Sequence, residues 1–231
     1  LPIHESSMYR IVLANLMSPE VRSITLVAQQ SYGLQDEIRD AQSAFPAKLN
    51  LVEINYYTAG PAESVELALE HLDLSLPVVV ANSDQFVDFE IQPFYELLLR
   101  EGVDGTILTM EDDDTKWSYV KINEYGYVTQ VREKVVISRD ATVGIYGFRS
   151  GALLKDAIIA MRKAKDFVNN ELYVAPAYTY LIKDGGKILP VGLGPVSTVM
   201  HGLGIPEDYE AFLRRPVSKV VAAEAVNLFG G

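Results

Sequence analysis

The sequence lacks cysteine altogether, and it has only three histidines among its 231 residues. Without cysteine, disulfides and thiolate metal sites are excluded. His4, His71 and His201 are scattered along the chain and do not have the spacing of metal ligands. A Walker loop, a Rossmann glycine fingerprint and a serine–histidine–aspartate arrangement are also missing. None of these common signatures therefore indicates the activity.

Long apolar runs and an excess of positive charge are also lacking. No hydrophobic run approaches the roughly 18 residues of a membrane span, and no signal peptide precedes the first expected helix. We therefore expect a cytoplasmic protein with no membrane insertion. Lysine and arginine number 20 against 31 acidic residues, and the resulting formal net charge of −11 argues against nucleic acid as a partner. A phosphate ligand on so acidic a chain would need a bridging cation.

What the sequence does contain is regular hydrophobic periodicity. Hydrophobic residues make up 48% of the chain, which is enough for a sizeable core. In the first half, strand-like runs alternate with runs of helical spacing: strands at 23–29, 49–55, 77–82 and 105–110, and helices at 8–17, 32–45, 61–72 and 91–101. Strict alternation of this kind is typical of an α/β fold with a mostly parallel sheet covered on both faces.

The second half of the chain departs from this alternation. β-rich runs on either side of Glu124-Tyr125-Gly126 predict a hairpin. Further elements are expected as strands at 142–148 and 187–191, and as helices at 150–163, 169–182 and from 206 onward. The economical interpretation is one domain over 1–215, with an α/β half and a smaller β-rich part. A tail over 216–231 follows, with a role that the sequence does not indicate.

The strand that begins at Pro77 ends in three polar residues, Asn82, Ser83 and Asp84. Asn and Asp tolerate turns, so a plain transition from strand to loop explains them. The alternative is a metal ligand, because open α/β folds place their ligands at the carboxyl ends of strands. Mg²⁺ is commonly held by one or two carboxylates together with substrate phosphates. The residues alone leave both interpretations open.

Two other segments have candidate ligand groups at turns. Gly60 lies between a strand and a helix, where a ligand can approach the backbone closely, although a turn capped by Thr58 is the simpler interpretation. Glu133 and Lys134 follow a strand and would point to opposite faces of an extended chain. A carboxylate that accepts sugar hydroxyls and a lysine that binds phosphate would suit this pair. Two exposed loop charges are the alternative.

The single tryptophan, Trp117, lies next to the acidic run 111–114. The run is expected to be a solvated loop. The indole ring suits either packing against the apolar face of a sugar or packing in the core. Farther along, Glu171 is a candidate for sugar contact, whereas the tyrosines that follow it are most simply interpreted as core residues.

The order of six segments is more specific than any one of them: TAGPAES, PVVVANSDQFVDF, KWSYVKINEYGYVTQVREK, VGIYGFRSG, NNELYVAPAYTYLI and GLGIPEDYEAFL. In this order they resemble the nucleotidyltransferase family of sugar-1-phosphate pyrophosphorylases, and within it a bacterial branch linked to capsule and surface-polysaccharide genes. The resemblance covers about Leu1 to Leu213. It implies a Rossmann-like three-layer α/β/α, GT-A-like fold. It also implies Mg²⁺-dependent nucleotidyl transfer from an NTP to a sugar 1-phosphate, with release of pyrophosphate.

The resemblance further implies roles for individual residues. Asp84 would hold Mg²⁺, and Asp84 and Lys134 would be the catalytic residues. The nucleotide contacts it implies are Gly60, Glu63, Asn82 and Ser83, and the sugar contacts are Trp117, Glu133, Gly144, Glu171 and Tyr173.

The sequence departs from the family pattern at two points. The family's G-x-G-x-R loop and P-K-P run would precede Leu1, so we expect the chain without them to be a poor catalyst. A second Mg²⁺-binding Asp found in many relatives corresponds to Gly202, which leaves that ligand open.

Two other functions also remain open at this stage. They are a phosphocholine-type cytidylyltransferase, with the acidic run beside Trp117 caging the cationic head group, and a non-catalytic domain that binds nucleotide sugars. The base, the sugar and any homo-oligomer are not indicated.

Overall fold

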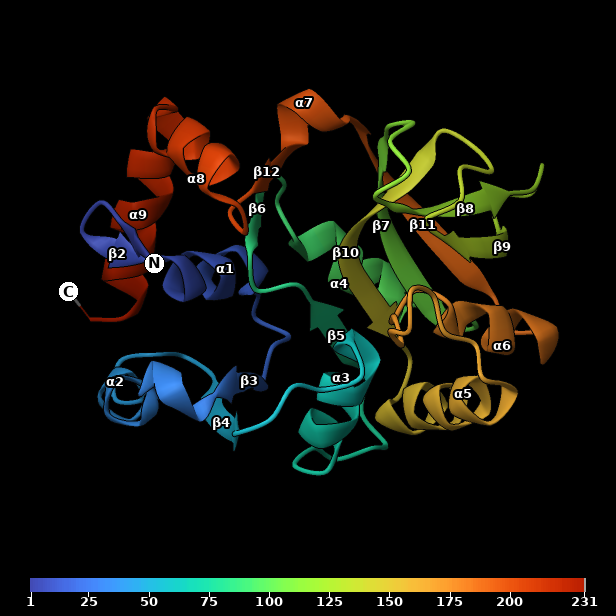
Figure 1. Ribbon diagram of the computed structural model, residues 1–231, viewed down its shortest axis with the longest axis horizontal. Helices are drawn as coiled ribbons and strands as arrows, with labels where there is room; N and C mark the ends of the chain where they lie inside the picture. Colours follow the sequence, from blue (N-terminus) through green and yellow to red (C-terminus); the bar gives the residue numbers. More distant parts are fainter. Residues whose placement is uncertain (231) are drawn as a thin grey trace. The chain divides into compact units, whose positions relative to one another are not determined.

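The computed structural model describes residues 1–230, without the side chains of residues 197 and 198. The chain divides into two compact units, whose helices and strands are labelled in Figure 1. Unit 1 comprises Leu1–Asn55, Asn82–Ile91 and Ser197–Gly231, and unit 2 comprises Tyr56–Ala81 and Gln92–Val196. Each unit has its own hydrophobic core, and we describe each by itself.

Unit 2 is built on a six-stranded mixed sheet. Its strands are β5 (Val78–Ala81), β7 (Gly105–Glu111), β8 (Ser118–Ile122), β9 (Val128–Glu133), β10 (Asp140–Phe148) and β11 (Ile188–Pro195). They are ordered β11-β7-β10-β8-β9, with β5 also paired to β10. β11 and β7 are parallel, whereas β10 runs antiparallel to β5, β7 and β8. β8 and β9 form the predicted hairpin, with Gly126 at a φ of 83° in its turn.

Four helices belong to unit 2: α3 (Pro61–Leu69), α4 (Gln92–Leu99), α5 (Gly151–Ala164) and α6 (Ala177–Lys183). α5 begins where the Ser150 side chain accepts a hydrogen bond from the Leu153 amide at 3.2 Å, which satisfies one of the free N–H groups of the first turn. α5 and α6 pack side by side (Figure 1). Beneath them the rings of Phe148 and Tyr178 stack with centroids 4.5 Å apart. The core of unit 2 thus lies between this helix pair and the sheet.

Unit 1 contains three two-stranded sheets. They are the antiparallel pair β1 (Pro2–Ile3) and β2 (Ser6–Ser7), the parallel pair β3 (Ser23–Gln29) and β4 (Lys48–Ile54), and the antiparallel pair β6 (Gln85–Val87) and β12 (Met200–Gly202). Its helices are α1 (Met8–Leu16), the 3₁₀ turn η1 (Gln30–Tyr32), α2 (Gln35–Ala41), α8 (Pro206–Leu213) and α9 (Pro216–Leu228); the short α7 (Val196–Val199) leads into β12.

The tail at 216–231 contributes to the core of unit 1. Val221, Ala222 and Ala225 of α9 are buried in one cluster with Ile3 and Phe212. Helix α9 also packs along α1. The apolar character of the tail is therefore explained by burial within unit 1, beside the first residues of the chain.

The α/β class is confirmed, and the helices and strands predicted in the first half are all present, with ends shifted by a few residues. The sheet is mixed, with fewer parallel pairs than the alternation indicated. Among the described strands only β3–β4 and β11–β7 are parallel. Hydrophobic periodicity shows which segments are buried but carries no information about the direction in which two strands pair.

The helix predicted over 169–182 is wrong in its first half, because α6 begins only at Ala177. Asn169 and Asn170 have φ values of 50° and 64°, outside the right-handed helical region. Leu172 instead pairs with the loop before α3: its amide donates to the Ala59 carbonyl at 2.7 Å, and its carbonyl accepts from the Ala62 amide at 2.9 Å. A long-range backbone pairing therefore overrides the local helical spacing.

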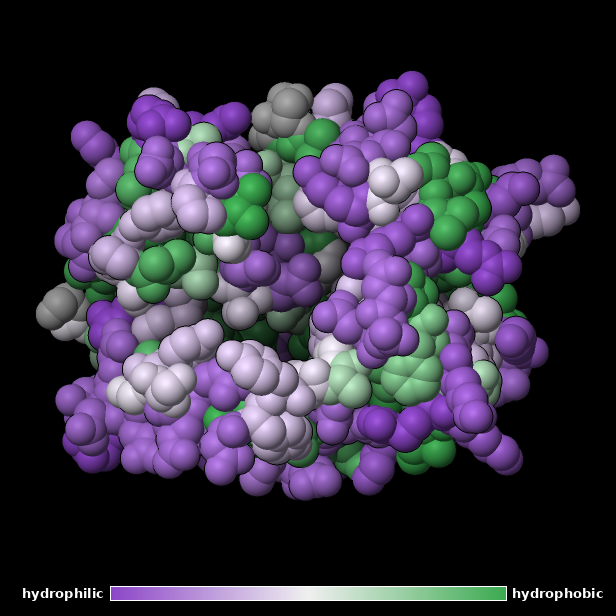
Figure 2. Space-filling model, in the orientation of Figure 1, coloured by the Kyte–Doolittle hydropathy of each residue, from purple (hydrophilic) through white to green (hydrophobic). Residues whose placement is uncertain are grey.

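On the face shown in Figure 2, hydrophilic side chains cover most of the surface, and apolar residues lie between them in smaller patches. Within residues 1–230, no helix combines the length and the apolar character needed to cross a bilayer.

Candidate functional site

Glu133 ends β9 and is buried, with 8% of its surface exposed. It lies opposite Ser118 of β8 in the hairpin register, and the Ser118 hydroxyl donates a hydrogen bond to its Oε2. Burial raises the pKa of the Glu133 carboxyl, while the Ser118 hydrogen bond and the nearby Lys134 charge act in the opposite direction. The interpretation of Glu133 as an exposed loop charge is thus wrong, and the residue is a carboxylate held inside the fold.

Lys134 leaves the strand with a φ of 55°, so the backbone bends at this residue instead of staying extended. Its ammonium donates to the Tyr173 hydroxyl at 2.6 Å and lies 4.6 Å from the centre of the Tyr173 ring. Tyr173 in turn donates to the Glu171 carboxylate. The hydrogen bond with Tyr173 is the main cause that raises the pKa of Lys134. Four predicted sugar or phosphate contacts, Glu133, Lys134, Glu171 and Tyr173, therefore form one cluster.

Gly144 lies in an irregular part of β10, next to the strands that carry this cluster. Its φ is 75°, and the register of β10 against β7 shifts between Thr142 and Tyr146. A glycine is suited to such a bulge because it has no Cβ to clash at positive φ. Gly144 is buried in this strand, so its predicted contact with a sugar depends on the backbone at the bulge.

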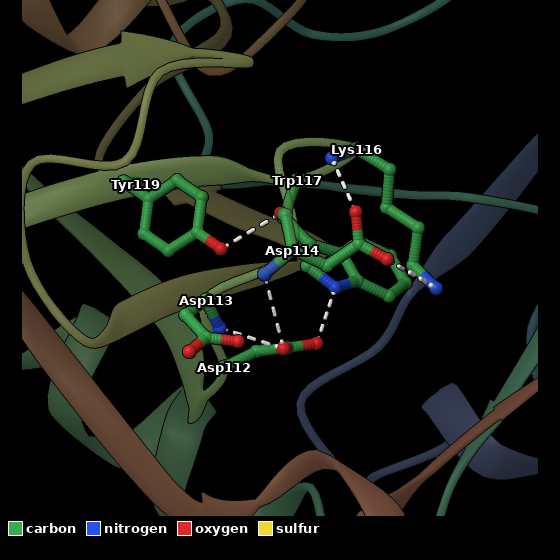
Figure 3. Close-up of polar contacts among 6 residues, drawn as sticks. All are labelled: Asp112, Asp113, Asp114, Lys116, Trp117 and Tyr119. Carbon is green, nitrogen blue, oxygen red and sulfur yellow. Dashed lines mark hydrogen bonds and ion pairs between the residues drawn. The ribbon is translucent and has the colours of Figure 1, made fainter.

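Trp117 is held by the acidic run that precedes it (Figure 3). Asp112 accepts from the Trp117 indole nitrogen at 2.6 Å through Oδ2, while its Oδ1 accepts from the amides of Asp113 and Asp114. The Lys116 ammonium lies 4.8 Å from the centre of the indole ring. Asp113 and Asp114 are exposed as predicted, whereas Asp112 is half-buried and structures the loop.

The segment before α3 forms a compact turn around Gly60. Gly60 is buried and caps α3 with a φ of 122°, and a Cβ at this position would lie 2.6 Å from the Leu172 nitrogen. Glu63, a predicted nucleotide contact, reaches back from the first turn and accepts from the Ala59 amide at 2.5 Å. This arrangement has the character of a capping interaction, so the Glu63 carboxylate already has a local structural partner.

Replacing Gly60 with alanine is expected to lower the free energy of unfolding by about 3 kcal/mol, because the new Cβ would add backbone strain and a clash with Leu172. Gly126→Ala is the matched control: Gly126 has a φ of 83° but no atom within 4 Å of the added Cβ. Chemical denaturation of both variants measures the difference. Equal losses would show that the contact with Leu172 contributes nothing.

Asn82, Ser83 and Asp84 belong to unit 1, where they precede β6. The Asp84 carbonyl accepts from the Leu203 amide at 2.8 Å. Asp84 is exposed, and no described residue donates a hydrogen bond to its carboxylate. Such a carboxylate fits the single protein ligand that Mg²⁺ often takes when substrate phosphates and water complete its shell. The described residues hold no group of three or more His, Asp or Glu side chains arranged for a metal.

Two glycines lie close to carboxylates of unit 1: Gly202, the last residue of β12, and Gly204, two positions later. A Cβ at Gly204 would lie 2.5 Å from Asp84 Oδ2, and a Cβ at Gly202 would lie 2.9 Å from Asp208 Oδ2. A side chain at position 202 would therefore start next to Asp208, which lies in the first turn of α8.

Gly204→Ala is expected to displace the Asp84 carboxylate, because a methyl group 2.5 Å from Oδ2 is well inside van der Waals contact. If Asp84 holds Mg²⁺, as the resemblance to the family implies, the binding of Mg²⁺ should weaken by about tenfold, an effect of ~1.4 kcal/mol. Isothermal titration of Mg²⁺ in the presence of nucleotide measures this change. Gly192→Ala is the control, because the nearest atom to its added Cβ is 3.9 Å away. Unchanged Mg²⁺ affinity in Gly204→Ala would contradict the prediction.

The sequence analysis missed Ser118, Asp112 and Tyr146 as parts of this region. Ser118 directly follows Trp117 on a strand predicted to pair with the strand that carries Glu133. The predicted hairpin therefore indicated that Ser118 and Glu133 lie on neighbouring strands, and the register shows that they lie directly opposite each other. Tyr146 gives no comparable signal, because its hydroxyl bonds Thr142 of the same strand, β10, at a point where the register of β10 against β7 shifts.

The buried Glu133 carboxyl should make stability depend on pH. Because its folded pKa is raised, the folded state binds the proton more tightly than the unfolded chain does. Its contribution to stability is thus complete below the unfolded pKa, and is lost as the pH rises through the raised folded value. In Glu133→Gln this part of the slope should vanish. Urea denaturation at several pH values from acid to neutral measures it, with the exposed Glu124→Gln as the control. Identical slopes for Glu133→Gln and the original protein would contradict the prediction.

A family model described as nucleotidyl transferase matches residues 1–179. The structure is similar to the nucleoside-diphosphate-sugar pyrophosphorylase from Vibrio cholerae RC9, with a TM-score of 0.76 and 23% identity over 93% of this chain and 90% of that one. It is also similar to a Bacillus anthracis protein provisionally assigned as a glucose-1-phosphate thymidylyltransferase, solved with sucrose (TM-score 0.73, 15% identity, 96% and 85% covered).

A third similar structure is the inositol-1-phosphate CTP transferase from T. maritima, with a TM-score of 0.68 and 12% identity over 95% of this chain and 83% of that one. None of the curated proteins matches the sequence. At these identities, the similarity to the solved structures establishes the fold alone.

Proposed function

The chain belongs to the nucleotidyl transferase family, and from this membership we propose that it transfers a nucleotidyl group from an NTP to a sugar 1-phosphate. In the proposed reaction an oxygen of the sugar phosphate attacks the α-phosphorus in line. The bond between the α-phosphorus and the oxygen that bridges to the β-phosphorus breaks, and pyrophosphate leaves with that oxygen. The product is a nucleoside diphosphate sugar. No protein nucleophile is needed, because positioning and charge neutralisation supply the catalysis.

The observation that carries this proposal is the cluster of Glu133, Lys134, Tyr173 and Glu171 in unit 2. It combines a fixed ammonium, whose partner Tyr173 is a neutral hydroxyl, with a carboxylate that has one oxygen bonded to Ser118. An ammonium is suited to a phosphate and a carboxylate to the hydroxyls of a sugar. A sugar phosphate presents both groups a few ångströms apart, which makes it the ligand class that fits this pair.

Lys134 is proposed to bind the sugar phosphate and to neutralise charge that develops on the α-phosphate during attack. Glu133 accepts from sugar hydroxyls through Oε1. Tyr173, which is itself bonded to Glu171, holds the lysine, and both residues offer further polar contacts. Trp117, whose indole nitrogen is fixed by Asp112, offers the sugar the ring face that the Lys116 ammonium does not cover, and Gly144 contributes backbone at its bulge.

Asp84 is proposed to hold the Mg²⁺ in the complex with nucleotide. When bound, Mg²⁺ supplies positive charge that offsets the phosphate oxygens of the substrates. Gly60, Glu63, Asn82 and Ser83 remain the proposed nucleotide contacts. For Glu63 the contact requires the carboxylate to keep or exchange its bond with the Ala59 amide. We further propose that the product is a precursor of capsule or surface polysaccharide and that the protein makes it in the cytoplasm.

The cytidylyltransferase alternative finds less support. A cage for a cationic head group needs an open aromatic face flanked by free carboxylates. The Lys116 ammonium already lies 4.8 Å from the centre of the Trp117 ring, and Asp114 is paired with the same lysine at 3.3 Å. Asp112 uses both of its oxygens within the loop. The Trp117 ring is therefore already in contact with a cation of the protein itself, Lys116.

The test is an assay of this protein with each of several NTPs and sugar 1-phosphates, with release of pyrophosphate as the readout. Calorimetric titration of the same ligands, with and without Mg²⁺, measures binding independently. Mg²⁺-dependent pyrophosphate release with one sugar phosphate is expected, together with its binding. Turnover of phosphocholine in place of any sugar phosphate would support the cytidylyltransferase. Binding of nucleotide sugars without turnover would show a binding domain.

A further inference from the structure

Glu133 belongs to a buried group of polar side chains in unit 2. Its four members are each at most 8% exposed: Glu133, Ser118, Thr142 and Tyr146. The Ser118 hydroxyl donates to Glu133 Oε2, and the hydroxyls of Thr142 and Tyr146 hydrogen-bond at 2.9 Å. Ser118 is among the groups that lower the pKa of Tyr146, so the two pairs lie next to each other. The side chains come from β8, β9 and β10, three neighbouring strands of one sheet.

The direction of the hydrogen bond between Ser118 and Glu133 is fixed by chemistry. Ser118 has a single O–H, and an ionised carboxylate can only accept, so the serine proton is committed to Glu133. The serine oxygen keeps its lone pairs beside the neighbouring hydroxyls of Thr142 and Tyr146, and either of these two can be the donor in the bond between them. Neighbouring polar groups in a buried setting polarise one another, which strengthens the bond from Ser118 to Glu133.

This group leaves the two oxygens of Glu133 in different states. Oε2 is bonded to Ser118, while none of the described residues donates a hydrogen bond to Oε1. The charged groups near the carboxylate are Lys134, directly after it on the chain, and Glu171, which is paired with Tyr173. An anchored oxygen and a free one on the same carboxylate are what a ligand hydroxyl needs, because the rotamer is set before the ligand arrives.

We propose that Ser118, supported by Tyr146 and Thr142, is a positioning residue that fixes the Glu133 carboxylate with Oε1 free for a sugar hydroxyl. The part of this inference that concerns the sugar rests on the proposed function. The positioning itself depends only on the contacts within unit 2. Ser118 touches no substrate in this scheme and acts through Glu133.

The test compares Ser118→Ala and Tyr146→Phe with Ser138→Ala. Ser138 is the matched control because its hydroxyl bonds the Val120 carbonyl at 2.6 Å on the same hairpin but does not touch Glu133. The Glu133 carboxyl is titrated by ¹³C NMR in each protein, and thermal unfolding checks that each variant is folded. The Glu133 pKa should rise in Ser118→Ala, because a bond that favours the ionised form is lost. A smaller rise is expected in Tyr146→Phe and none in Ser138→Ala.

A second readout follows substrate use. In Ser118→Ala the KM for the sugar 1-phosphate should rise about tenfold, the effect of one lost hydrogen bond to a charged group, while kcat and the KM for NTP stay within about twofold. If Ser118→Ala does not fold, Tyr146→Phe, which keeps the ring, is the variant that decides.

An unchanged Glu133 titration in the folded variants would overturn the inference, as would equal rises in the variants and the Ser138→Ala control. A raised Glu133 pKa in a protein that uses no sugar phosphate would instead overturn the proposed function and leave the positioning by Ser118 standing. The two failures are therefore distinguishable.

Discussion

Replacing Asp84 with asparagine is expected to lower nucleotidyl transfer by about a thousandfold, or ~4 kcal/mol in the free energy of activation. Asparagine has the same shape but no charge, so the protein would lose its proposed Mg²⁺ ligand. The backbone bond from the Leu203 amide to the Asp84 carbonyl would stay intact, and Asp84 is exposed, so stability should change little. Steady-state rates at several Mg²⁺ concentrations measure the effect.

The control for this variant is Asp88→Asn. Asp88 is exposed on the same segment, one residue after β6, and its amide bonds the Val199 carbonyl at 2.8 Å. Its replacement also removes one negative charge from unit 1, so it reports the effect of net charge alone. Activity should stay within about twofold of the original. If Asp84→Asn retained normal turnover with its usual Mg²⁺ dependence, Asp84 could not be the metal ligand.

Lys134→Met is expected to reduce kcat/KM for the sugar 1-phosphate by about a hundredfold, or ~3 kcal/mol. Methionine keeps much of the length of the lysine side chain but has no ammonium, so the phosphate would lose its proposed cation. The bond between Tyr173 and Glu171 can persist without it, and the site should keep its shape. Titration of the sugar phosphate against the variant separates weaker binding from slower chemistry.

Lys183→Met provides a control with closely matched geometry. The Lys183 ammonium lies 4.9 Å from the centre of the Tyr180 ring, much as the Lys134 ammonium lies over Tyr173, but it belongs to the end of α6. The same loss of charge and of a cation–π contact there should leave the activity within about twofold. A similar loss of activity in both variants would show that net charge, and not the place of Lys134, is responsible.

Much of this architecture could be predicted because it depends on local patterns. The helices and strands of the first half followed from apolar spacing, and the hairpin of β8 and β9 from the turn at Glu124-Tyr125-Gly126. Both signals arise from residues a few positions apart, which the sequence displays directly. The order of the motifs led to the family in the same way, because motif order is a property of the sequence itself.

The helix predicted over 169–182 shows where such reasoning fails. Leu172 has helical spacing with its neighbours, yet its backbone pairs with Ala59 and Ala62, more than a hundred positions earlier in the chain. A contact at that separation leaves no trace in local periodicity. The local signs against a helix are the two adjacent asparagines, Asn169 and Asn170, which have positive φ, and Pro176, a residue disfavoured inside a helix.

The sequence by itself determined the α/β class, most element positions, the acidic character and the chemical types of the candidate residues. Only the tertiary structure decided that Glu133 is buried and that Lys134 bends away from its strand to Tyr173. It also decided that Ser118, next to Tyr146, donates a hydrogen bond to the Glu133 carboxylate. The physical reason is that burial and hydrogen bonding depend on which strands become neighbours. Strand order and register are set by the packing of the whole sheet. They determine the environment of each side chain, whereas the sequence gives only its chemical type.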